Sequence, residues 1–480
     1  MRDDEIRRYL RARNPWWKLA AGGGDPLGWV RQDPVLQAAA TVGIQYSPAL
    51  LDDVAPPGLC VVRGPRRVGK SVSCKRLIAK LCERPEYSPW QVIYLSVDAF
   101  RAQDLRRAFT LGRDLTALAG ERPRIWILDE VTAVSGWVPL IKELRDNTEL
   151  AFDAVVLTGS SARDLAEARR SLGAGRTRLA DPFRLALPMS FREFVGVTSV
   201  SVPAPDPVPP EALMGDAART AIRSLEPFVD DLDLAWQRFL ECGGFPRAVG
   251  EFLHQGEISA EFVFDLMSWL TSDVDVEGPP DSVARLLIEL HGRTGAPLNV
   301  RNTAEALGVT RARLDLRVRR LVETFGAFRC PQLGVDGDAA PGSQSKLYLL
   351  DPLLARLPTL RDPSLPEVDF TRLTEGQLAL ELARSIDRVA PDRLVEQRAV
   401  FYARTGKGNE VDFAPVPVPG PSAVERSVPL ESKWVSKSWR RESLALRGRY
   451  GRGILATKDA LDLTDDVWAV PAPILALLLN

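Results

Sequence analysis

Four short apolar runs mark the first two hundred residues, and stretches with helical spacing lie between them. The runs occupy 59–62, 92–95, 125–128 and 154–157, and the helical stretches occupy 72–81, 105–118 and 138–147. Short apolar runs bounded by polar residues are typical of strands buried on both faces. Strands that alternate with helices favour a parallel sheet, because each helix carries the chain back across the sheet. The pattern predicts an α/β fold.

The first apolar run leads directly into a phosphate-binding loop. The pattern G-x-x-x-x-G-K-S is formed by Gly64, Pro65, Arg66, Arg67, Val68, Gly69, Lys70 and Ser71. The glycines let successive backbone N–H groups face phosphate oxygens, and a helix that begins near Lys70 points its positive end at them. Lys70 supplies charge near the β- and γ-phosphates, and the Ser71 hydroxyl can reach Mg²⁺. We expect ATP and Mg²⁺ as cofactors.

The third run ends in two adjacent acids, Asp129 and Glu130. A parallel sheet brings the carboxyl ends of its strands to one edge, so both acids are expected beside the phosphate-binding loop. There Asp129 can bind Mg²⁺ through water, and Glu130 can polarise the water that attacks the γ-phosphate. The spacing predicts an ATP hydrolase.

Two further residues are candidates for the catalytic edge. The fourth run ends in Thr158-Gly159-Ser160-Ser161, and a polar residue here is expected between the loop and the acid pair. Ser160 resembles the sensor-1 position of the AAA+ ATPases, where a side chain touches the γ-phosphate or the attacking water. Arg176 either neutralises transition-state charge, in cis or from a neighbouring subunit, or is a solvated loop arginine. Whether the protein forms a homo-oligomer therefore stays open.

Composition adds limits on the class of protein. The 480 residues are enough for about three domains, and 45% of them are apolar. A formal charge of −1 gives no global attraction to nucleic acid. Five scattered cysteines and two histidines indicate neither a disulfide framework nor a zinc cluster, which fits a reducing cytoplasm. We find no signal sequence or spanning segment and expect no membrane partner.

Five segments follow from changes in composition: 1–50, 51–200, 211–278, 279–355 and 362–480. In the first, Trp16, Trp17 and Trp29 either pack an arm on the nucleotide domain or stack on adenine. The second is the ATPase core, and five prolines between 203 and 210 form a linker after it. The third segment shows helices on both sides of Gly243-Gly244 and predicts a helical lid.

The segment 279–355 has helix-turn-helix spacing, with Gly308 at the turn and an arginine-rich helix at 311–323. Leu314, Val318 and Leu321 form its expected buried stripe. The remaining basic side chains are left for solvent or phosphate, namely Arg311, Arg313, Arg317, Arg319 and Arg320. Two strand-like runs, 325–329 and 346–350, would supply a hairpin. We predict a winged helix, with DNA contact and packing or regulation as alternatives.

The segment 362–480 carries a candidate second active site. Glu375 and Glu381 lie on a predicted helix, Asp412 follows a predicted strand, and Glu431 and Lys433 share one face of another strand by the period of two. Asp412, Glu431 and Lys433 with Glu375 resemble the acids and lysine of the PD-(D/E)xK nucleases. Such carboxylates hold Mg²⁺ while the lysine positions water. A latent nuclease and an inactive binding platform both stay open, and four prolines at 415–421 argue against a regular central hairpin.

The succession as a whole resembles one family, the STAND-related AAA+-type ATPases of archaea and bacteria with a C-terminal restriction-endonuclease-like domain. Its marks are the acid pair before Gly136-Trp137, Thr158-Gly159-Ser160-Ser161, Ser190-Phe191-Arg192-Glu193-Phe194 and Cys242-Gly243-Gly244-Phe245-Pro246. The resemblance implies a three-layer α/β P-loop NTPase core with a helical lid, a winged helix and a restriction-endonuclease-like α/β domain. It favours a nucleotide-driven switch coupled to DNA binding or processing. The alternative is a STAND-like signalling ATPase whose C-terminal domains bind protein and are catalytically inactive.

Overall fold

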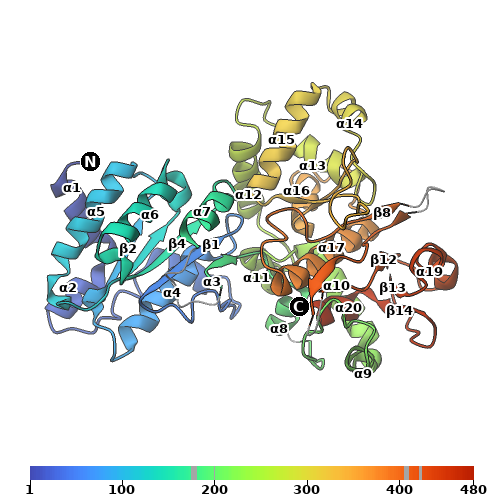
Figure 1. The fold of residues 1–480 in the computed structure, drawn as a ribbon, viewed down its shortest axis with the longest axis horizontal. Coiled ribbons are helices and arrows are strands. Elements are labelled where there is room, and N and C mark those ends of the chain that lie inside the picture. The colour runs from blue at the N-terminus through green and yellow to red at the C-terminus, as the bar shows by residue number, and fades with distance from the viewer. Residues whose placement is uncertain (174–180, 199, 405–409, 421–423) are drawn as a thin grey trace. The chain divides into compact units, whose positions relative to one another are not determined.

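A parallel sheet of five strands forms the centre of the N-terminal part of the chain (Figure 1). Its strands are β1 (Gly58–Arg63), β2 (Val92–Ser96), β3 (Ile125–Asp129), β4 (Ala154–Gly159) and β5 (Phe183–Leu185). They lie in the order β2-β3-β4-β1-β5, and every neighbouring pair is parallel. The predicted α/β sheet is confirmed, and β4 lies between the strands that precede the phosphate-binding loop and the acid pair.

The computed structural model describes residues 1–173, 181–198, 200–404, 410–420 and 424–480, which form two units, 1–187 and 188–480. Helices α1 (Asp3–Arg13), α2 (Pro15–Ala21), α3 (Pro34–Thr41), α4 (Lys70–Glu83), α5 (Ala102–Leu115), α6 (Trp137–Asn147) and α7 (Leu165–Leu172) surround the sheet of the first unit. In the parts of the chain that the structure describes, no helix is both long and apolar enough to cross a membrane.

The N-terminal arm covers the edge of the sheet that β2 forms. Trp16 and Trp17 each donate their indole N–H to the carbonyl oxygen of Val92, at 3.0 Å. The Asn14 side chain pairs with both backbone groups of Tyr94, accepting from its N–H at 2.7 Å and donating to its carbonyl at 2.9 Å. The arm thereby occupies hydrogen-bonding groups of the edge strand β2. The tryptophans are buried in this packing, as the first of the two interpretations predicts.

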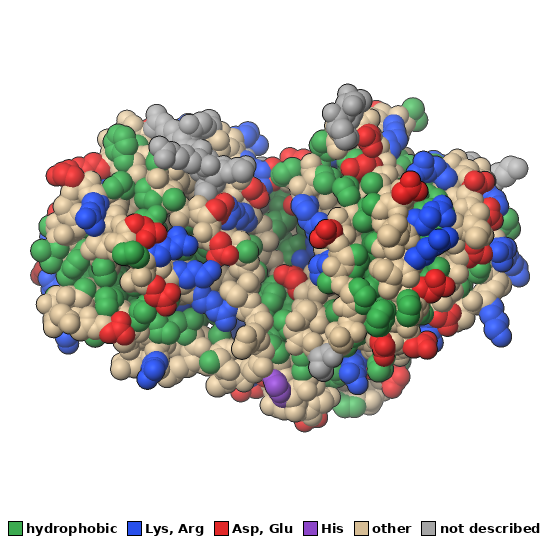
Figure 2. Space-filling model, turned by 90° about the horizontal axis from the view of Figure 1, so that it is seen from below, with side chains coloured by type: hydrophobic (Ala, Val, Ile, Leu, Met, Phe, Trp, Pro, Cys, Tyr) green, Lys and Arg blue, Asp and Glu red, His purple; other side chains and the backbone are tan. Residues whose placement is uncertain are grey.

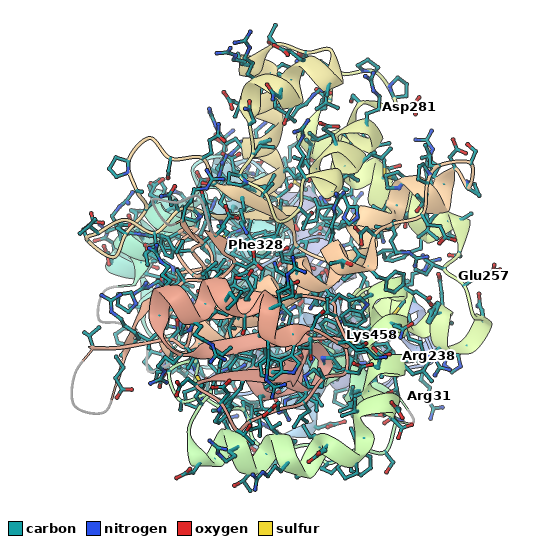
Figure 3. All side chains as sticks on the ribbon, turned by 90° about the vertical axis from the view of Figure 1, so that its right-hand side faces the viewer. Arg31, Arg238, Glu257, Asp281, Phe328 and Lys458 are labelled. Atoms are coloured by element: carbon teal, nitrogen blue, oxygen red, sulfur yellow. The ribbon has the colours of Figure 1, made fainter. Side chains whose placement is uncertain are left out.

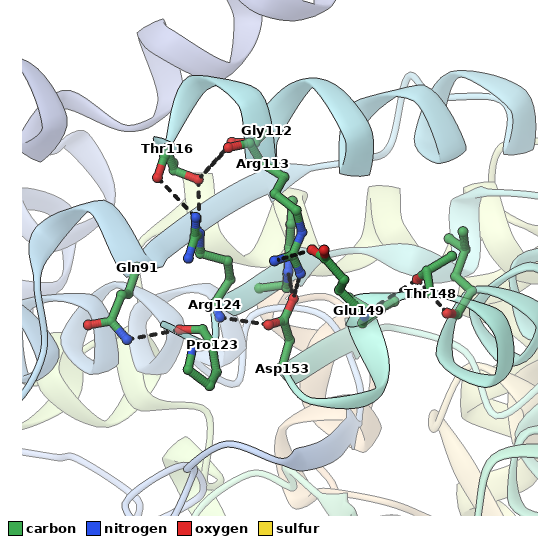
Figure 4. A network of polar contacts seen from close by, with 12 residues as sticks. Gln91, Gly112, Arg113, Thr116, Pro123, Arg124, Thr148, Glu149 and Asp153 are labelled. Carbon is green, nitrogen blue, oxygen red and sulfur yellow. Dashed lines mark hydrogen bonds and ion pairs between the residues drawn. The ribbon is translucent and has the colours of Figure 1, made fainter. Parts of the chain in front are cut away.

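A network of charged side chains ties together the amino ends of β3 and β4, at the sheet edge opposite the phosphate-binding loop (Figure 4). The Asp153 carboxylate accepts from the backbone N–H of Arg124 at 2.7 Å and from the indole of Trp126 at 2.8 Å. Arg113 joins Asp153 to Glu149. Since these bonds lie at the far ends of the strands, their role is to hold the sheet that positions the loops.

The second unit is mainly helical and carries short sheets. Its helices are α8 (Phe191–Val197), α9 (Asp216–Leu225), α10 (Val229–Cys242), α11 (Pro246–Gln255), α12 (Ala260–Val274), α13 (Ser282–Gly292), α14 (Val300–Leu307), α15 (Arg311–Glu323), α16 (Pro352–Arg361), α17 (Phe370–Val389), α18 (Trp439–Glu442), α19 (Leu444–Tyr450) and α20 (Ala472–Leu479). Helix α20 is buried along its whole length and packs on α17, α10, α8 and α9, so the apolar C-terminal run is core.

Among the residues that the structure describes, the strands of the second unit form four sheets. They are β6 (Ala327–Cys330), β7 (Lys346–Leu349), β8 (Ala403–Arg404), β9 (Glu410–Val411), β10 (Pro417–Pro419), β11 (Val424–Arg426), β12 (Leu430–Ser432), β13 (Gly453–Thr457) and β14 (Val467–Pro471). The β12-β13-β14 sheet is parallel, and the other three are antiparallel pairs. Phe328 of β6 lies among the packed interior side chains in Figure 3, whereas Asp281 lies at the rim.

Prolines do not prevent pairing in the C-terminal region, where the sequence argued against a regular central hairpin. Strand β10 contains Pro417 and Pro419 and pairs antiparallel with β11, with Val418 opposite Glu425. The pair is a separate two-stranded sheet, and a strand with only one neighbour tolerates missing N–H groups.

The two glycines after α10 are required by close packing. A Cβ on Gly243 would lie 2.0 Å from Asp351 Oδ1, and one on Gly244 would lie 2.3 Å from the carbonyl oxygen of Met189. The buried Asp351 carboxylate accepts from the backbone N–H groups of Gly244 and Leu353, both at 2.8 Å. The Gly243-Gly244 pair therefore fastens the end of α10 to the start of α16.

The arginine-rich helix α15 does not leave all its arginines free, which corrects the predicted solvent face. Arg317 is buried and pairs with the buried carboxylate of Asp275 at 2.5 Å. Arg313 also pairs with Asp275, and Arg320 donates to the carbonyl of Val274 at 3.4 Å. The C-terminal end of α12 packs on this side of α15. Arg311 and Arg319 remain exposed.

Arg317→Ala is expected to lower the free energy of unfolding by about 3 kcal/mol, because removing one member of a buried ion pair leaves the other charge buried. Arg319→Ala, two residues further along the same helix and exposed, is the matched control and is expected to change the free energy of unfolding by less than about 0.5 kcal/mol. Urea unfolding of the two variants measures the difference. Equal, small losses would show that the Asp275 pair is not important for stability.

The imidazole of His291, in the last turn of α13, is expected to make the protein less stable in acid. Burial and the positive charge of Arg372 lower its pKa to about 4. An unfolded histidine has a pKa near 6.5, so between about pH 6.5 and 4 the unfolded chain binds a proton that the folded chain does not. Stability from this group is present above that window and is lost as the pH falls through it.

The variant His291→Leu removes this titration. When the pH changes from 7.5 to 5.0, we expect the melting temperature of this variant to fall less than that of the wild type. The corresponding difference in the free energy of unfolding is roughly 1–2 kcal/mol at the lower pH. Parallel falls in the two proteins would exclude His291 as a source of acid sensitivity.

Candidate functional site

The loop between β1 and α4 is folded around the side chain of Lys70. Lys70 is the first residue of α4, and its ammonium group donates to the carbonyl oxygens of Gly64 at 2.9 Å and Pro65 at 2.6 Å. Gly69 has a φ of 95°, a left-handed conformation that glycine adopts without strain. A Cβ on Gly64 would lie 1.8 Å from the carbonyl oxygen of Ala186, so this position also requires glycine. The backbone is shaped for close approach by a ligand.

The other loop residues differ in exposure. Arg66 and Arg67 are exposed, Val68 is buried, and Ser71 is half-buried in the first turn of α4. Burial lowers the pKa of Lys70 to about 8, while the charges of Glu130 and Asp129 oppose this effect. A buried ammonium group beside the N-terminus of a helix is suited to an anionic ligand.

Asp129 ends β3 and is held from both neighbouring strands. Its carboxylate accepts from the hydroxyl of Tyr94 on β2 at 3.0 Å and from the hydroxyl of Thr158 on β4. Thr158 also accepts from the backbone N–H of Glu130, at 3.0 Å. These contacts fix the direction of the first acid at the carboxyl edge of the sheet.

The side chain of Glu130 is fixed by residues from two segments. Its Oε1 accepts from the backbone N–H of Ser160 at 3.0 Å, from the Ser160 hydroxyl at 2.7 Å and from the Thr132 hydroxyl at 2.9 Å. Burial alone would raise the pKa of Glu130, but the positive charge of Lys70 and these hydrogen bonds lower it overall. Glu130 is thus ionised at neutral pH, which a group that orients or activates water requires.

The structure brings Lys70, Asp129, Glu130 and Ser160 to one edge of the sheet, and sequence reasoning missed several of their partners. The sequence marks Thr158 only as part of a strand end. Tyr94 gave no signal because its contact with Asp129 comes from the neighbouring strand, and Thr132 gave none because it reaches Glu130 through a turn. Arg176 lies outside the described residues. Each candidate role stays a prediction.

Arg63 is another residue that sequence reasoning missed at this edge. It ends β1 immediately before the loop and is fully buried. Its guanidinium lies 4.9 Å from the centre of the Trp137 ring, and a Cβ on Gly159 would lie 1.8 Å from its Nη1. Its position directly before Gly64 in an otherwise apolar strand was the available signal.

The four residues of the predicted nuclease-like site also lie together, within the second unit. The ammonium of Lys433 lies 2.9 Å from Glu431 and 3.7 Å from Asp412. The backbone N–H of Asp412 donates to Glu431 at 3.1 Å. Glu375 of α17 joins them through Lys346, whose ammonium lies 3.6 Å from Glu375 and 2.8 Å from Asp412. We call the acids Glu375, Glu410, Asp412 and Glu431, together with the lysines Lys346 and Lys433 that pair with them, the carboxylate cluster.

Glu381 lies elsewhere, which corrects its expected association with Glu375. It is fully buried and accepts from the backbone N–H of Phe191 at 2.8 Å and from Gln377 at 2.7 Å. Six residues along a helix turn the side chain to another face, where this carboxylate caps α8.

The carboxylate cluster has unusual protonation. Burial and the negative charge of Asp412 raise the pKa of Glu375 to about 7 and that of Glu431 to about 8. Burial would also raise the pKa of Asp412, but Lys346 and Lys433 lower it overall. Among the residues that the structure describes, no group of three or more His, Cys, Asp or Glu side chains is arranged to hold a metal ion.

Comparisons with known proteins agree with the geometry of the first unit. The family model described as AAA domain matches residues 57–195, which contain the loop, the acid pair and Ser160. No curated protein matches the chain. The segment 57–195 is thus similar to AAA domains, and its parallel five-stranded sheet fits the α/β core of a P-loop NTPase.

Solved structures resemble the chain only distantly. The Walker-type ATPase of Pyrococcus abyssi has 15% identity and a TM-score of 0.39, with 64% of this chain and 92% of that one covered. The Orc1 protein of Aeropyrum pernix, solved in complex with DNA, has 14% identity and a TM-score of 0.31, with 69% and 92% covered. At these scores neither likeness bears on activity or partners.

Proposed function

We propose that the protein is a Mg²⁺-dependent ATPase that acts as a nucleotide-driven switch. The observation that carries the proposal is the position of Glu130, whose carboxylate is held by Ser160 and Thr132 at the sheet edge that also carries Lys70. An ionised carboxylate and a buried ammonium at one edge are the groups that phosphoryl transfer to water requires.

In this proposal each residue of the site has a separate role. Lys70 and the N–H groups of the loop bind the phosphates, and Ser71 and Asp129 would hold Mg²⁺, which neutralises phosphate charge when bound. Glu130 orients the attacking water and receives its proton. Ser160 holds Glu130, and in the proposed switch it senses the state of the γ-phosphate. Arg176 is the candidate for additional positive charge in the transition state.

Asp129→Asn is expected to lower Mg²⁺-dependent ATP turnover at least about 100-fold, because one charged oxygen ligand and the partner of Thr158 are altered. Phosphate release measured with Mg²⁺, with Mn²⁺ and with EDTA tests this. Asp98→Asn, an exposed acid after β2, is the matched control and should retain wild-type turnover. Wild-type turnover in Asp129→Asn would overturn the assignment of Asp129.

For the second unit we propose a helical lid at 211–278, a winged helix at 279–355 and a restriction-endonuclease-like domain at 362–480. Helices α13, α14 and α15 with the β6–β7 hairpin support the winged helix. The parallel β12-β13-β14 sheet beside α17 supports the last domain. In the proposed switch, ATP changes the lid, and the following domains bind or release a partner.

DNA is the first candidate partner, and a protein is the second. The observation that favours a protein partner, as in a STAND-like signalling ATPase, is the pairing of Arg313 and Arg317 with Asp275, which removes both from any phosphate contact. On the face that Figure 2 shows, basic and acidic side chains are interspersed.

Nucleotide-dependent binding to duplex, branched and single-stranded DNA, read with a mass measurement of the assembly, separates the two candidates. If DNA binds, Arg311→Ala with Arg319→Ala should flatten the dependence of affinity on salt, because each lost phosphate contact removes about one unit of the log–log slope. An absence of DNA binding in every nucleotide state favours a protein partner.

A further inference from the structure

Lys346 lies at the centre of the carboxylate cluster. It opens β7, and its side chain is fully buried. Its ammonium lies 2.8 Å from Asp412 Oδ1, 2.9 Å from Glu410 Oε1 and 3.6 Å from Glu375 Oε1. The three acids come from α17 and from the segment that contains β9. One ammonium group is thus surrounded by carboxylates from separate parts of the second unit.

A second residue of β7, Tyr348, also contacts the acids of the cluster. Two residues beyond Lys346, Tyr348 is also buried and donates its hydroxyl to Glu375 at 2.7 Å. Residues two apart on a strand face the same side, so β7 presents an ammonium and a hydroxyl together to the acids. The Lys346 ammonium also lies 5.5 Å from the centre of the Tyr402 ring. The β6–β7 hairpin is therefore bound to the C-terminal domain through its polar side chains.

These contacts leave no place for a divalent ion among the acids. Mg²⁺ requires carboxylate oxygens at about 2.0–2.1 Å in near-octahedral order, so several oxygens must converge on one point. Here the Asp412 and Glu410 oxygens converge on the Lys346 ammonium instead. Other oxygens of the cluster are engaged as well: Asp412 Oδ2 accepts from the backbone N–H of Ser432 at 3.1 Å, and Glu431 pairs with Lys433.

We propose that Lys346 is the resident cation of the carboxylate cluster and stands where a divalent metal would otherwise bind. The cluster is then a charge-paired core that joins the β6–β7 hairpin to the C-terminal domain, and the domain binds its partner without cleaving it. The same geometry implies a concealed metal site: removal of the Lys346 amine leaves Glu375, Glu410 and Asp412 able to bind one divalent cation. This inference goes beyond ATP hydrolysis and concerns the other unit of the chain.

The test compares wild type, Lys346→Met and Lys437→Met in the absence of nucleotide. Methionine keeps most of the length of the lysine stem and removes the charge, and Lys437 is an exposed lysine of the same domain. Manganese binding is followed by the electron paramagnetic resonance of free Mn²⁺. We expect Lys346→Met to bind one Mn²⁺ per chain at micromolar concentration, and wild type and Lys437→Met to bind at least tenfold more weakly. Adding Asp412→Asn to Lys346→Met should abolish the new site.

Thermal unfolding keeps the test decisive if Lys346→Met folds poorly without metal. Mn²⁺ should then raise the melting temperature of Lys346→Met and leave that of wild type unchanged. The proposal is overturned if wild type itself binds one Mn²⁺ that Asp412→Asn removes, or if wild type cleaves DNA in an Asp412-dependent reaction. It is equally overturned if Lys346→Met neither binds Mn²⁺ nor gains stability from it. Because no nucleotide is present, failure here is independent of the ATPase proposal.

Discussion

Glu130→Gln is expected to bind ATP with near wild-type affinity and to hydrolyse it about 10²–10⁴-fold more slowly. Glutamine retains an Oε1 that can accept the hydrogen bonds from Ser160 and Thr132, so the geometry of the site should survive. What is lost is the negative charge that orients the attacking water and takes its proton. Binding of a fluorescent ATP analogue and single-turnover hydrolysis measure the two effects separately.

Glu121→Gln, an exposed glutamate before β3, is the matched control and should hydrolyse ATP at the wild-type rate. Equal single-turnover rates in Glu130→Gln and wild type would show that another group activates the water. A parallel loss of affinity and rate would instead indicate that the substitution has disturbed the loop.

Lys70→Ala is expected to weaken ATP binding by about 10- to 100-fold or more. Charge-assisted hydrogen bonds of the kind that this ammonium offers to phosphate contribute about 1.5–3 kcal/mol each. The melting temperature without nucleotide should be unchanged or higher, because Lys70 is buried and its desolvation lowers its pKa to about 8. A loss of affinity with intact folding therefore identifies Lys70 as a ligand-binding residue.

Lys80→Ala on the exposed side of the same helix is the control, since its ion pair with Asp52 lies at the surface and should matter little. Isothermal titration compares the affinities, and calorimetric unfolding compares the stabilities. If Lys70→Ala and Lys80→Ala bind ATP equally well, the loop is not the nucleotide site.

The sequence pattern was sufficient to predict the sheet edge of the first unit, because each of its motifs is contained in one short stretch of sequence. The strands that carry Gly64 and Asp129 are continuous apolar runs, and a parallel sheet necessarily brings their carboxyl ends to one edge. The position of β4 beside both strands agrees with the expectation that a polar residue at its end lies between the loop and the acid pair, whereas the full strand order was not predicted. The partners of Glu130 were only partly predictable, since Thr132 reaches it by a turn that periodicity does not specify.

The buried ion pairs of the second unit could not be predicted in this way. Lys346 pairs with Asp412 across 66 residues, and no spacing rule connects a hairpin strand to an acid in another domain. Helical periodicity assigned Arg317 to solvent because arginine is usually exposed, but Asp275, which directly follows α12, neutralises it in the interior. Both errors concern buried ion pairs, whose members look like surface residues in the sequence.

The most direct test of the central claim is a calorimetric titration of wild type with ATP and Mg²⁺. A nucleotide site built by Lys70, Ser71 and Asp129 predicts saturable binding of one ATP per chain, competition by ADP, and loss of the signal in Lys70→Ala. Saturable binding that persists unchanged in Lys70→Ala, or no binding by folded wild type, would contradict it.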